Sequence, residues 1–110
     1  MGVYDQIINP QDLRSIDSAT INGAYQLIDS LFGEPIIILK IVNDSDQAVT
    51  VSYNGTDDHD YIPANSFTLY DVCANKFVDR AGMKFSAKRG VYVKGTAGTG
   101  NIYVIALSTD

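Results

Sequence analysis

Beyond residue 20, apolar and polar positions alternate along most of the chain with a period of two. This period is typical of strands that bury one face, because successive side chains of a strand point to opposite sides. The pattern predicts about eight short strands, over residues 21–27, 36–42, 48–53, 59–62, 66–72, 83–87, 91–94 and 101–108. We therefore predict an all-β protein, an antiparallel β-sandwich with a jelly-roll-like arrangement.

Three local patterns refine this prediction. Residues 36–42 form a near-continuous apolar run rich in β-branched residues, which indicates a strand buried on both faces or central in a sandwich. A later strand alternates, with Phe67 and Leu69 on one face. The pair Asn54 and Gly55 predicts a type I′ hairpin turn, because both central residues of that turn need a positive φ angle.

Residues 1–20 differ from the rest, because their apolar side chains follow no sustained period. Asn9 and Pro10 suit the N-cap and first position of a short helix, which would end by about Ser18. The segment is too short to bury itself, so it is either a frayed arm or one that docks on a neighbouring subunit, and we favour the docked arm. The chain thus divides into an N-terminal arm, residues 1–20, and a single β-sandwich domain, residues 21–110.

Composition and charge narrow the class of protein. Of the 110 residues, 45% are hydrophobic and 19% are charged, which suits one globular domain. No apolar stretch approaches the roughly 20 residues that span a bilayer, and we expect no secretory signal, since the first residues lack its basic and apolar regions. Residues 1–60 carry ten acidic and two basic side chains, and residues 61–110 carry three acidic and six basic ones. This division suits complementary patches between neighbours, or neutralisation within one fold.

The densest polar cluster consists of Asp57, Asp58, His59 and Asp60. Three carboxylates and an imidazole could hold a divalent cation such as calcium or manganese. Neighbours in an extended segment point to opposite faces, however, so one such tetrapeptide rarely supplies more than two ligands to one point. We therefore expect these side chains to cap the turn after Gly55, with His59 bonded to a backbone carbonyl, and we assign no metal site.

Other chemistry has less support. The segment from Gly95 to Gly100 has the glycine spacing of a phosphate-binding loop, but Asn101 and Ile102 replace the lysine and hydroxyl residue of that motif, so we expect a hairpin loop. The chain has one histidine and one cysteine, Cys73, which are too few for the usual sets of zinc ligands. A catalytic triad would have to include the single histidine. We predict no catalytic residue, no cofactor and no enzymatic activity.

All six basic residues of the second half lie between residues 76 and 94, interleaved with aromatic residues, as in some nucleic-acid-binding faces. The pI of about 4.5 opposes that interpretation, because the overall field of the domain repels phosphate. We expect solvated strand faces or contact with an acidic neighbour instead.

Several strings of residues occur in an order that points to a family. They are residues 40–45, 49–52, 54–56, 58–64, 66–71, 91–100 and 102–104. Together they resemble small virion structural proteins that tailed bacteriophages encode among their head and tail morphogenesis genes. The resemblance covers residues 36–107 and brings no catalytic residues with it.

The resemblance implies a non-enzymatic structural component of a tailed-phage virion, made in the bacterial host cytoplasm and assembled in multiple copies on the capsid or at the head–tail or tail region. Its implied partners are other virion proteins (the major capsid protein and portal, neck or tail proteins) and further copies of the chain. We expect no direct contact with nucleic acid or with a membrane. The alternative is a glycan-binding or host-surface-binding module of a phage fibre or spike, and a third hypothesis is a small metal-dependent hydrolase centred on His59.

Overall fold

The computed structural model describes residues 8–33, 36–71 and 89–109, and in these residues the protein is all-β. The only helix within those ranges is a 3-10 turn, η2 (Ser18–Thr20). The strands are β1 (Ile8–Pro10), β2 (Arg14–Asp17), β3 (Gln26–Leu27), β4 (Ile36–Ser45), β5 (Val49–Ser52), β6 (Asp60–Ile62), β7 (Ser66–Asp71), β8 (Tyr92–Gly95) and β9 (Gly100–Thr109). The predicted all-β class is confirmed.

Some predictions from the sequence lie outside the described residues. They concern the first seven residues of the predicted arm, the predicted strand over 83–87, the single cysteine Cys73, and four of the six basic residues of the second half, Lys76, Arg80, Lys84 and Lys88.

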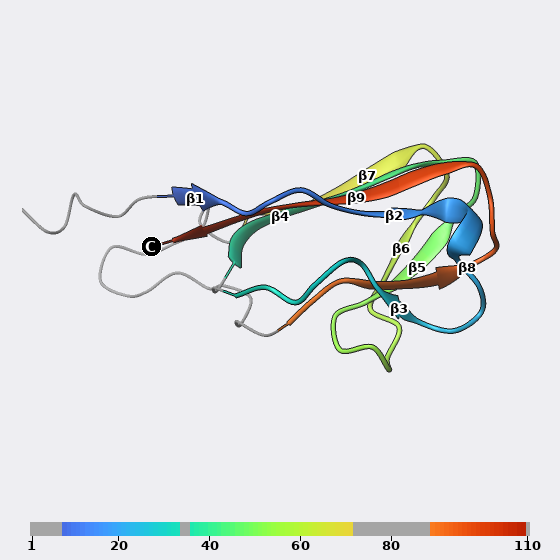
Figure 1. The fold of residues 1–110 in the computed structure, drawn as a ribbon, viewed down its shortest axis with the longest axis horizontal. Coiled ribbons are helices and arrows are strands. Elements are labelled where there is room, and N and C mark those ends of the chain that lie inside the picture. The colour runs from blue at the N-terminus through green and yellow to red at the C-terminus, as the bar shows by residue number, and fades with distance from the viewer. Residues whose placement is uncertain (1–7, 34–35, 72–88, 110) are drawn as a thin grey trace, which may run out of the picture.

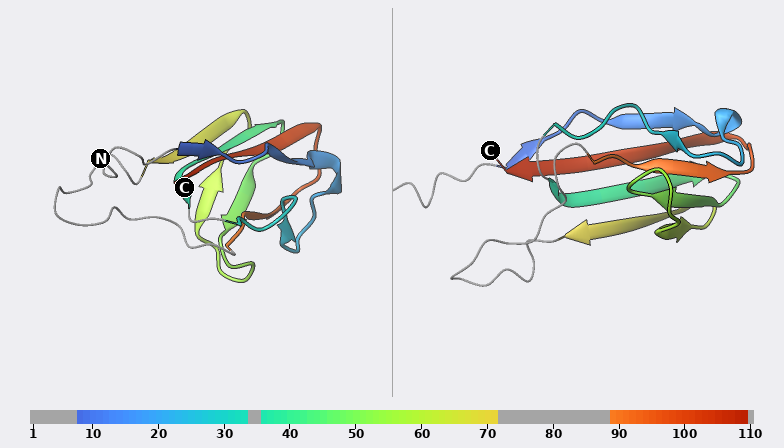
Figure 2. Two further views of the ribbon diagram at one scale, coloured as in Figure 1. Left: turned by 60° about the vertical axis from the view of Figure 1, so that its left-hand side comes forward. Right: turned by 90° about the horizontal axis from the view of Figure 1, so that it is seen from below.

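The strands form two antiparallel sheets (Figure 1, Figure 2). In the larger sheet, β9 has β4 on one side and both β1 and β2 on the other, and β7 pairs with the far edge of β4. In the smaller sheet the order is β3, β8, β5 and β6. The right-hand view of Figure 2 shows the long strands of the larger sheet side by side. Consecutive strands mostly alternate between the two sheets, so the chain crosses repeatedly from one sheet to the other.

The longest pairing joins β4 to β9, which are ten residues long each. It runs from Ile36 opposite Ser108 to Ser45 opposite Gly100, with a register shift just after Ile36. Alternate residues of β4, including Leu39, are fully buried, and the residues between them are half-buried or exposed. The run that we predicted to be buried on both faces, or central, is a central strand that buries one face completely and leaves the other partly open.

A core of apolar side chains lies between the sheets and draws on both of them. Its buried members are Ile21, Ile28, Phe32, Ile36, Leu39, Ile41, Val49, Val51, Ile62, Val91, Val93, Ile102, Val104 and Ala106. Complete burial of a side chain such as Leu or Ile contributes roughly 1.5–3 kcal/mol, so contact between the two sheets is the main source of stability.

One buried polar side chain, Asn43, ties the end of β4 to the segments that lead into and out of the smaller sheet. Its amide nitrogen lies 2.9 Å from the carbonyl oxygen of Gln47, 3.2 Å from that of Ile62 and 3.1 Å from that of Pro63. Its amide oxygen accepts a hydrogen bond from the Ser45 hydroxyl. The strand predicted to end at residue 42 continues to Ser45, because these polar side chains find their partners inside the protein.

The connection from β8 to β9 passes from the smaller sheet to the larger one. The hairpin loop predicted over residues 95–100 is therefore wrong, since the strands on either side of it do not pair. Gly100 begins β9 with a φ angle of 118°, and a Cβ atom at this position would lie 2.1 Å from the carbonyl oxygen of Asp44. The two backbones can approach this closely only because residue 100 is glycine.

The described part of the predicted arm, residues 8–20, belongs to the larger sheet of its own chain, because β1 and β2 both pair with β9. The helix predicted to begin at Asn9 is wrong. Asn9 and Pro10 lie in β1 at the edge of the sheet, where the missing N–H of a proline is tolerated. Arg14 anchors β2, since its buried guanidinium donates hydrogen bonds to the carbonyl oxygens of Ser30 and Leu31.

Two local predictions are wrong for reasons of turn chemistry. The strand predicted over 21–27 is reduced to β3, because the Asn22 side chain accepts a hydrogen bond from the N–H of Ala24 and turns the backbone there. Asn54 and Gly55 do not form a type I′ turn, since only Gly55 of the two has a positive φ angle, 83°.

We predict that Gly100→Ala lowers the free energy of unfolding by more than about 3 kcal/mol, because a Cβ atom meets backbone atoms there and the φ angle favours glycine. The matched control is Gly23→Ala, since no atom lies within 4 Å of a Cβ atom at Gly23. Urea denaturation of both variants measures the difference. Equal stability of the two variants would contradict the observed approach of β9 to β4.

Asn43→Ala leaves three inward carbonyl oxygens without their shared donor, and we expect it to lower the free energy of unfolding by about 3 kcal/mol. Asn101→Ala is the control, because the half-buried Asn101 side chain donates one long hydrogen bond, to the Tyr103 hydroxyl at 3.4 Å. We expect a loss below about 1 kcal/mol for the control. Thermal and urea unfolding test both values, and similar losses for the two variants would remove the special role of Asn43.

Candidate functional site

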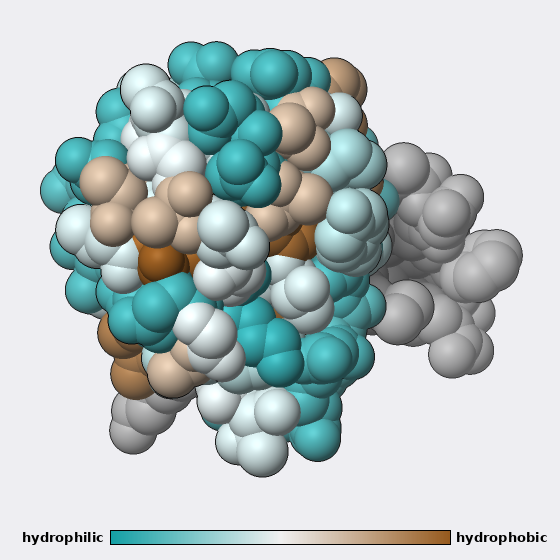
Figure 3. Space-filling view, turned by 90° about the vertical axis from the view of Figure 1, so that its right-hand side faces the viewer, coloured by the Kyte–Doolittle hydropathy of each residue, from teal (hydrophilic) through white to brown (hydrophobic). Residues whose placement is uncertain are grey.

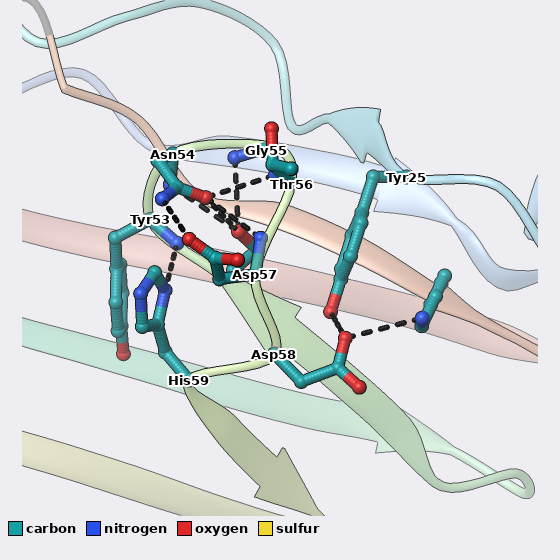
Figure 4. A network of polar contacts seen from close by, with 10 residues as sticks. Tyr25, Tyr53, Asn54, Gly55, Thr56, Asp57, Asp58 and His59 are labelled. Carbon is teal, nitrogen blue, oxygen red and sulfur yellow. Dashed lines mark hydrogen bonds and ion pairs between the residues drawn. The ribbon is translucent and has the colours of Figure 1, made fainter.

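The loop between β5 and β6 carries the densest polar cluster of the chain (Figure 4). Two side chains at its start hold its backbone. The Ser52 hydroxyl accepts hydrogen bonds from the N–H groups of Asn54 and Gly55. The Asn54 amide oxygen accepts from those of Thr56 and Asp57. The loop is therefore shaped by its own short polar side chains, in the manner of Asx and ST turns.

Asp57 completes this network. Its carboxylate accepts a hydrogen bond from the Asn54 amide nitrogen at 2.9 Å. Figure 4 shows the Asp57 carboxylate turned back over the loop toward Asn54. The carboxylate thus supports the loop that carries it by bonding to a side chain, while Ser52 and Asn54 cap the backbone N–H groups of the turn.

Asp58 points the other way, toward β3 and β8. The Tyr25 hydroxyl donates a hydrogen bond to the Asp58 carboxylate, and the Lys94 ammonium lies 3.1 Å from the same carboxylate and 4.7 Å from the centre of the Tyr25 ring. Hydrogen bonds from Tyr25 and Lys94 lower the pKa of Asp58. Burial of the phenol and its hydrogen bond to Asp58 raise the pKa of Tyr25 to about 12.

His59 and Asp60 bond to other groups than those that Asp57 and Asp58 contact. The Nδ1 atom of His59 accepts a hydrogen bond from the N–H of Tyr53 at 3.0 Å, and the His59 ring stacks on the Tyr53 ring with 5.6 Å between centroids. Acceptance at Nδ1 requires that Nε2 carry the ring proton. The carbonyl partner predicted for His59 is therefore wrong, because the imidazole accepts instead of donating.

The Asp60 carboxylate accepts hydrogen bonds from the Tyr70 hydroxyl and from the N–H of Tyr61. The hydrogen bond to Asp60, together with burial, raises the pKa of Tyr70. Burial also raises the pKa of Tyr53, whose ring meets the Tyr70 ring edge to face. Asp60 thus joins β6 of the smaller sheet to β7 of the larger one.

The four polar side chains singled out from the sequence therefore lie in one loop but serve different partners. Within residues 8–33, 36–71 and 89–109, no three His, Cys, Asp or Glu side chains are grouped so that they could hold a metal ion. The carboxylates accept hydrogen bonds from tyrosines, an amide and backbone groups, and the imidazole caps a backbone N–H. This arrangement stabilises a loop and brings no acid and base together on a common point.

The glycine-rich segment 95–100 holds a carboxylate of its own chain. The N–H of Thr99 donates to the Asp46 carboxylate at 2.9 Å, and the N–H of Gly98 donates to the carbonyl oxygen of Ser18. Figure 3 faces this end of the molecule, where hydrophilic and neutral residues cover most of the surface. Two backbone donors of this segment, the N–H groups of Gly98 and Thr99, are thus engaged with Ser18 and Asp46.

The feature with the clearest capacity for binding is the side of the larger sheet that faces away from the core. We call this surface the outer face, and define it by nine side chains of β4, β7 and β9 that alternate with inward ones: Ile38, Lys40, Val42, Phe67, Leu69, Asp71, Tyr103, Ile105 and Leu107. Phe67 is 60% exposed, Leu69 53% and Ile105 39%. Seven of the nine side chains are aliphatic or aromatic, which makes the outer face an apolar surface.

The sequence pattern did not reveal the outer face. It placed Phe67 and Leu69 on one side of a strand, which is confirmed, but an alternating strand does not state which of its sides is buried. Thr68 and Tyr70 point inward instead, because the Tyr70 hydroxyl reaches Asp60 across the gap between the sheets. The one signal of an outer apolar surface was the near-continuous apolar run over residues 36–42.

No protein-family model matches the chain, and none of the curated proteins matches it either. The roles of its residues therefore follow from the contacts described above. None of the helices in the described part of the chain is long and apolar enough to cross a membrane.

The raised pKa of Tyr25 gives a prediction about pH. Because the pKa rises from 10.0 to about 12 on folding, the protonated phenol is favoured in the folded state. Its contribution to stability is complete below pH 10 and is lost as the pH rises through about 12. Ultraviolet titration of the wild type minus Tyr25→Phe isolates this phenol, and we expect a midpoint near 12. In Asp58→Asn the midpoint falls, whereas the remote control Asp12→Asn leaves it unchanged. A difference curve centred near 10 in the wild type would contradict the contact.

Proposed function

We propose that the protein is a non-enzymatic structural component of a tailed-phage virion, assembled in multiple copies on the capsid or at the head–tail or tail region. The observation that carries the proposal is the outer face. Isolated exposed apolar residues are normal on protein surfaces, but a continuous apolar patch on one sheet is typical of an association site. The resemblance of residues 36–107 to virion structural proteins supplies the kind of assembly.

The strand order supports a finer description of the fold, a β-sandwich of the jelly-roll type. A jelly roll has two four-stranded antiparallel sheets, and the chain crosses between them repeatedly. Apart from β1, the order β2-β9-β4-β7 in one sheet and β3-β8-β5-β6 in the other follows this plan. Jelly rolls are common in viral capsid proteins, which agrees with the proposed role.

A role without catalysis agrees with the way in which the polar side chains are engaged. Asp57, Asp58, His59 and Asp60 bond to four different sets of partners, and each contact closes a loop or joins two strands. Covering the exposed apolar area would release further favourable free energy. A structural subunit gains this free energy when its surface binds a neighbouring subunit.

Quantitative mass spectrometry of gradient-purified particles, scaled to the major capsid protein, tests the proposal. We expect the chain in a fixed ratio to the capsid protein, well above a host cytoplasmic protein measured as a control for carry-over. A ratio near that of the capsid protein indicates a capsid position, and a small fixed number of copies indicates the neck or tail. Absence from particles, or presence only at the level of the control, would overturn the proposed function.

A further inference from the structure

We infer that the outer face is self-complementary and binds the outer face of a second copy of this chain. The inference rests on the proposed function for its biological setting, since a virion component in many copies needs a contact between copies. The evidence for it is local, and comes from the register of β4, β7 and β9 and from the places of two charges on β4.

The outer face is built in rows that cross the strands. One row consists of Phe67, Val42 and Tyr103, because Val42 pairs with both of its neighbours. The next row places Lys40 between the two exposed aliphatic side chains Leu69 and Ile105. The row of Val42 thus carries two aromatic rings and no charge.

Two opposite charges lie on β4 on either side of this uncharged row. Lys40 precedes Val42 by two residues and Asp44 follows it by two, so all three side chains point to the same side of the sheet. The Lys40 ammonium lies 5.0 Å from the centre of the Phe67 ring, which places the charge over the outer face, and Asp44 is exposed. Along its outer side, β4 therefore carries a positive charge, an apolar side chain and a negative charge, in that order.

This order is complementary to itself under a two-fold rotation. If the axis runs across the strands at Val42, each copy places Lys40 against Asp44 of the other copy, and the row of Phe67, Val42 and Tyr103 packs on its own symmetry mate. Such an isologous contact needs only one kind of surface, and it closes at two copies. Two ion pairs then flank a buried apolar row, which determines the register of the contact.

The size of the surface indicates a weak contact. The three strands of the outer face at their usual spacing, taken over the seven residues from Ile38 to Asp44, span about 330 Å² per copy. Stable complexes bury roughly 800 Å² per partner, so we expect a dimer that forms only at high concentration in solution. In an assembly of many copies the same weak contact gains strength from multiplicity.

Sedimentation equilibrium of the full chain, from about 10 to 500 μM, is the first part of the test, and we expect a reversible monomer–dimer equilibrium in this range. Phe67→Ser weakens it by about tenfold or more, because each dimer loses the packing of the two symmetry-related Phe67 rings. Tyr61→Ser, an equally exposed side chain on the smaller sheet, leaves it unchanged. Monomer at every concentration, or open-ended growth beyond the dimer, would overturn the inference.

Charge reversal tests the register. Lys40→Asp and Asp44→Lys, each made alone, place like charges opposite one another and weaken association by more than about 100-fold. The double variant K40D/D44K restores association, and so does an equal mixture of the two single variants, since each then supplies the charge that the other lacks. Arg89→Asp and Asp29→Lys change the net charge equally, lie in the segments next to β8 and β3 of the smaller sheet, and have no effect. Circular dichroism confirms that each variant is folded.

Failure of either charge rescue, with folded variants, would overturn the two-fold register. The outcome is separable from that of the proposed function. A chain that is monomeric in solution but present in particles would overturn self-association and leave the virion role intact. A chain that dimerises in solution but is absent from particles would leave self-association intact and overturn the virion role.

Discussion

The antiparallel pairing of β4 with β9 supports every other part of the larger sheet. β7 pairs only with β4 among the described strands, and β1 and β2 pair only with β9. The inward side chains of the same two strands, such as Leu39 and Val104, lie in the core against the smaller sheet. Their outward side chains form the centre of the outer face. One ladder of hydrogen bonds therefore positions both the core and the surface that we propose for association.

The polar groups of the protein keep this arrangement unique. Asn43 binds carbonyl oxygens just before β5 and at the end of β6, and Asp60 joins the two sheets through Tyr70. Buried polar groups are costly unless they are paired, so each of these contacts specifies one register. Because these groups are satisfied within the chain, the apolar outer face is the surface at which binding can gain the most.

The sequence was sufficient for the class of fold and for most strands, but not for the faces or for the N-terminal segment. Strands such as β4 and β7 were predictable because alternation and β-branched residues are local signals. The direction of Phe67 was not, since it depends on Tyr70 finding Asp60 across the core. The pairing of β1 and β2 with β9 joins residues 84 to 101 positions apart, and the preference of Asn9 and Pro10 for a helix start gave way to it. The polar loop was located correctly. Its partners Tyr25 and Lys94 could not be predicted, because residue spacing does not show which distant side chains meet in the fold.

We infer that the outer face of the larger sheet is covered in the assembled protein. Electron cryomicroscopy of purified particles, at a resolution that places side chains, tests it most directly. We expect Phe67, Leu69 and Ile105 to be buried against a second copy of the chain. Density in which every copy leaves these three side chains in solvent would contradict it.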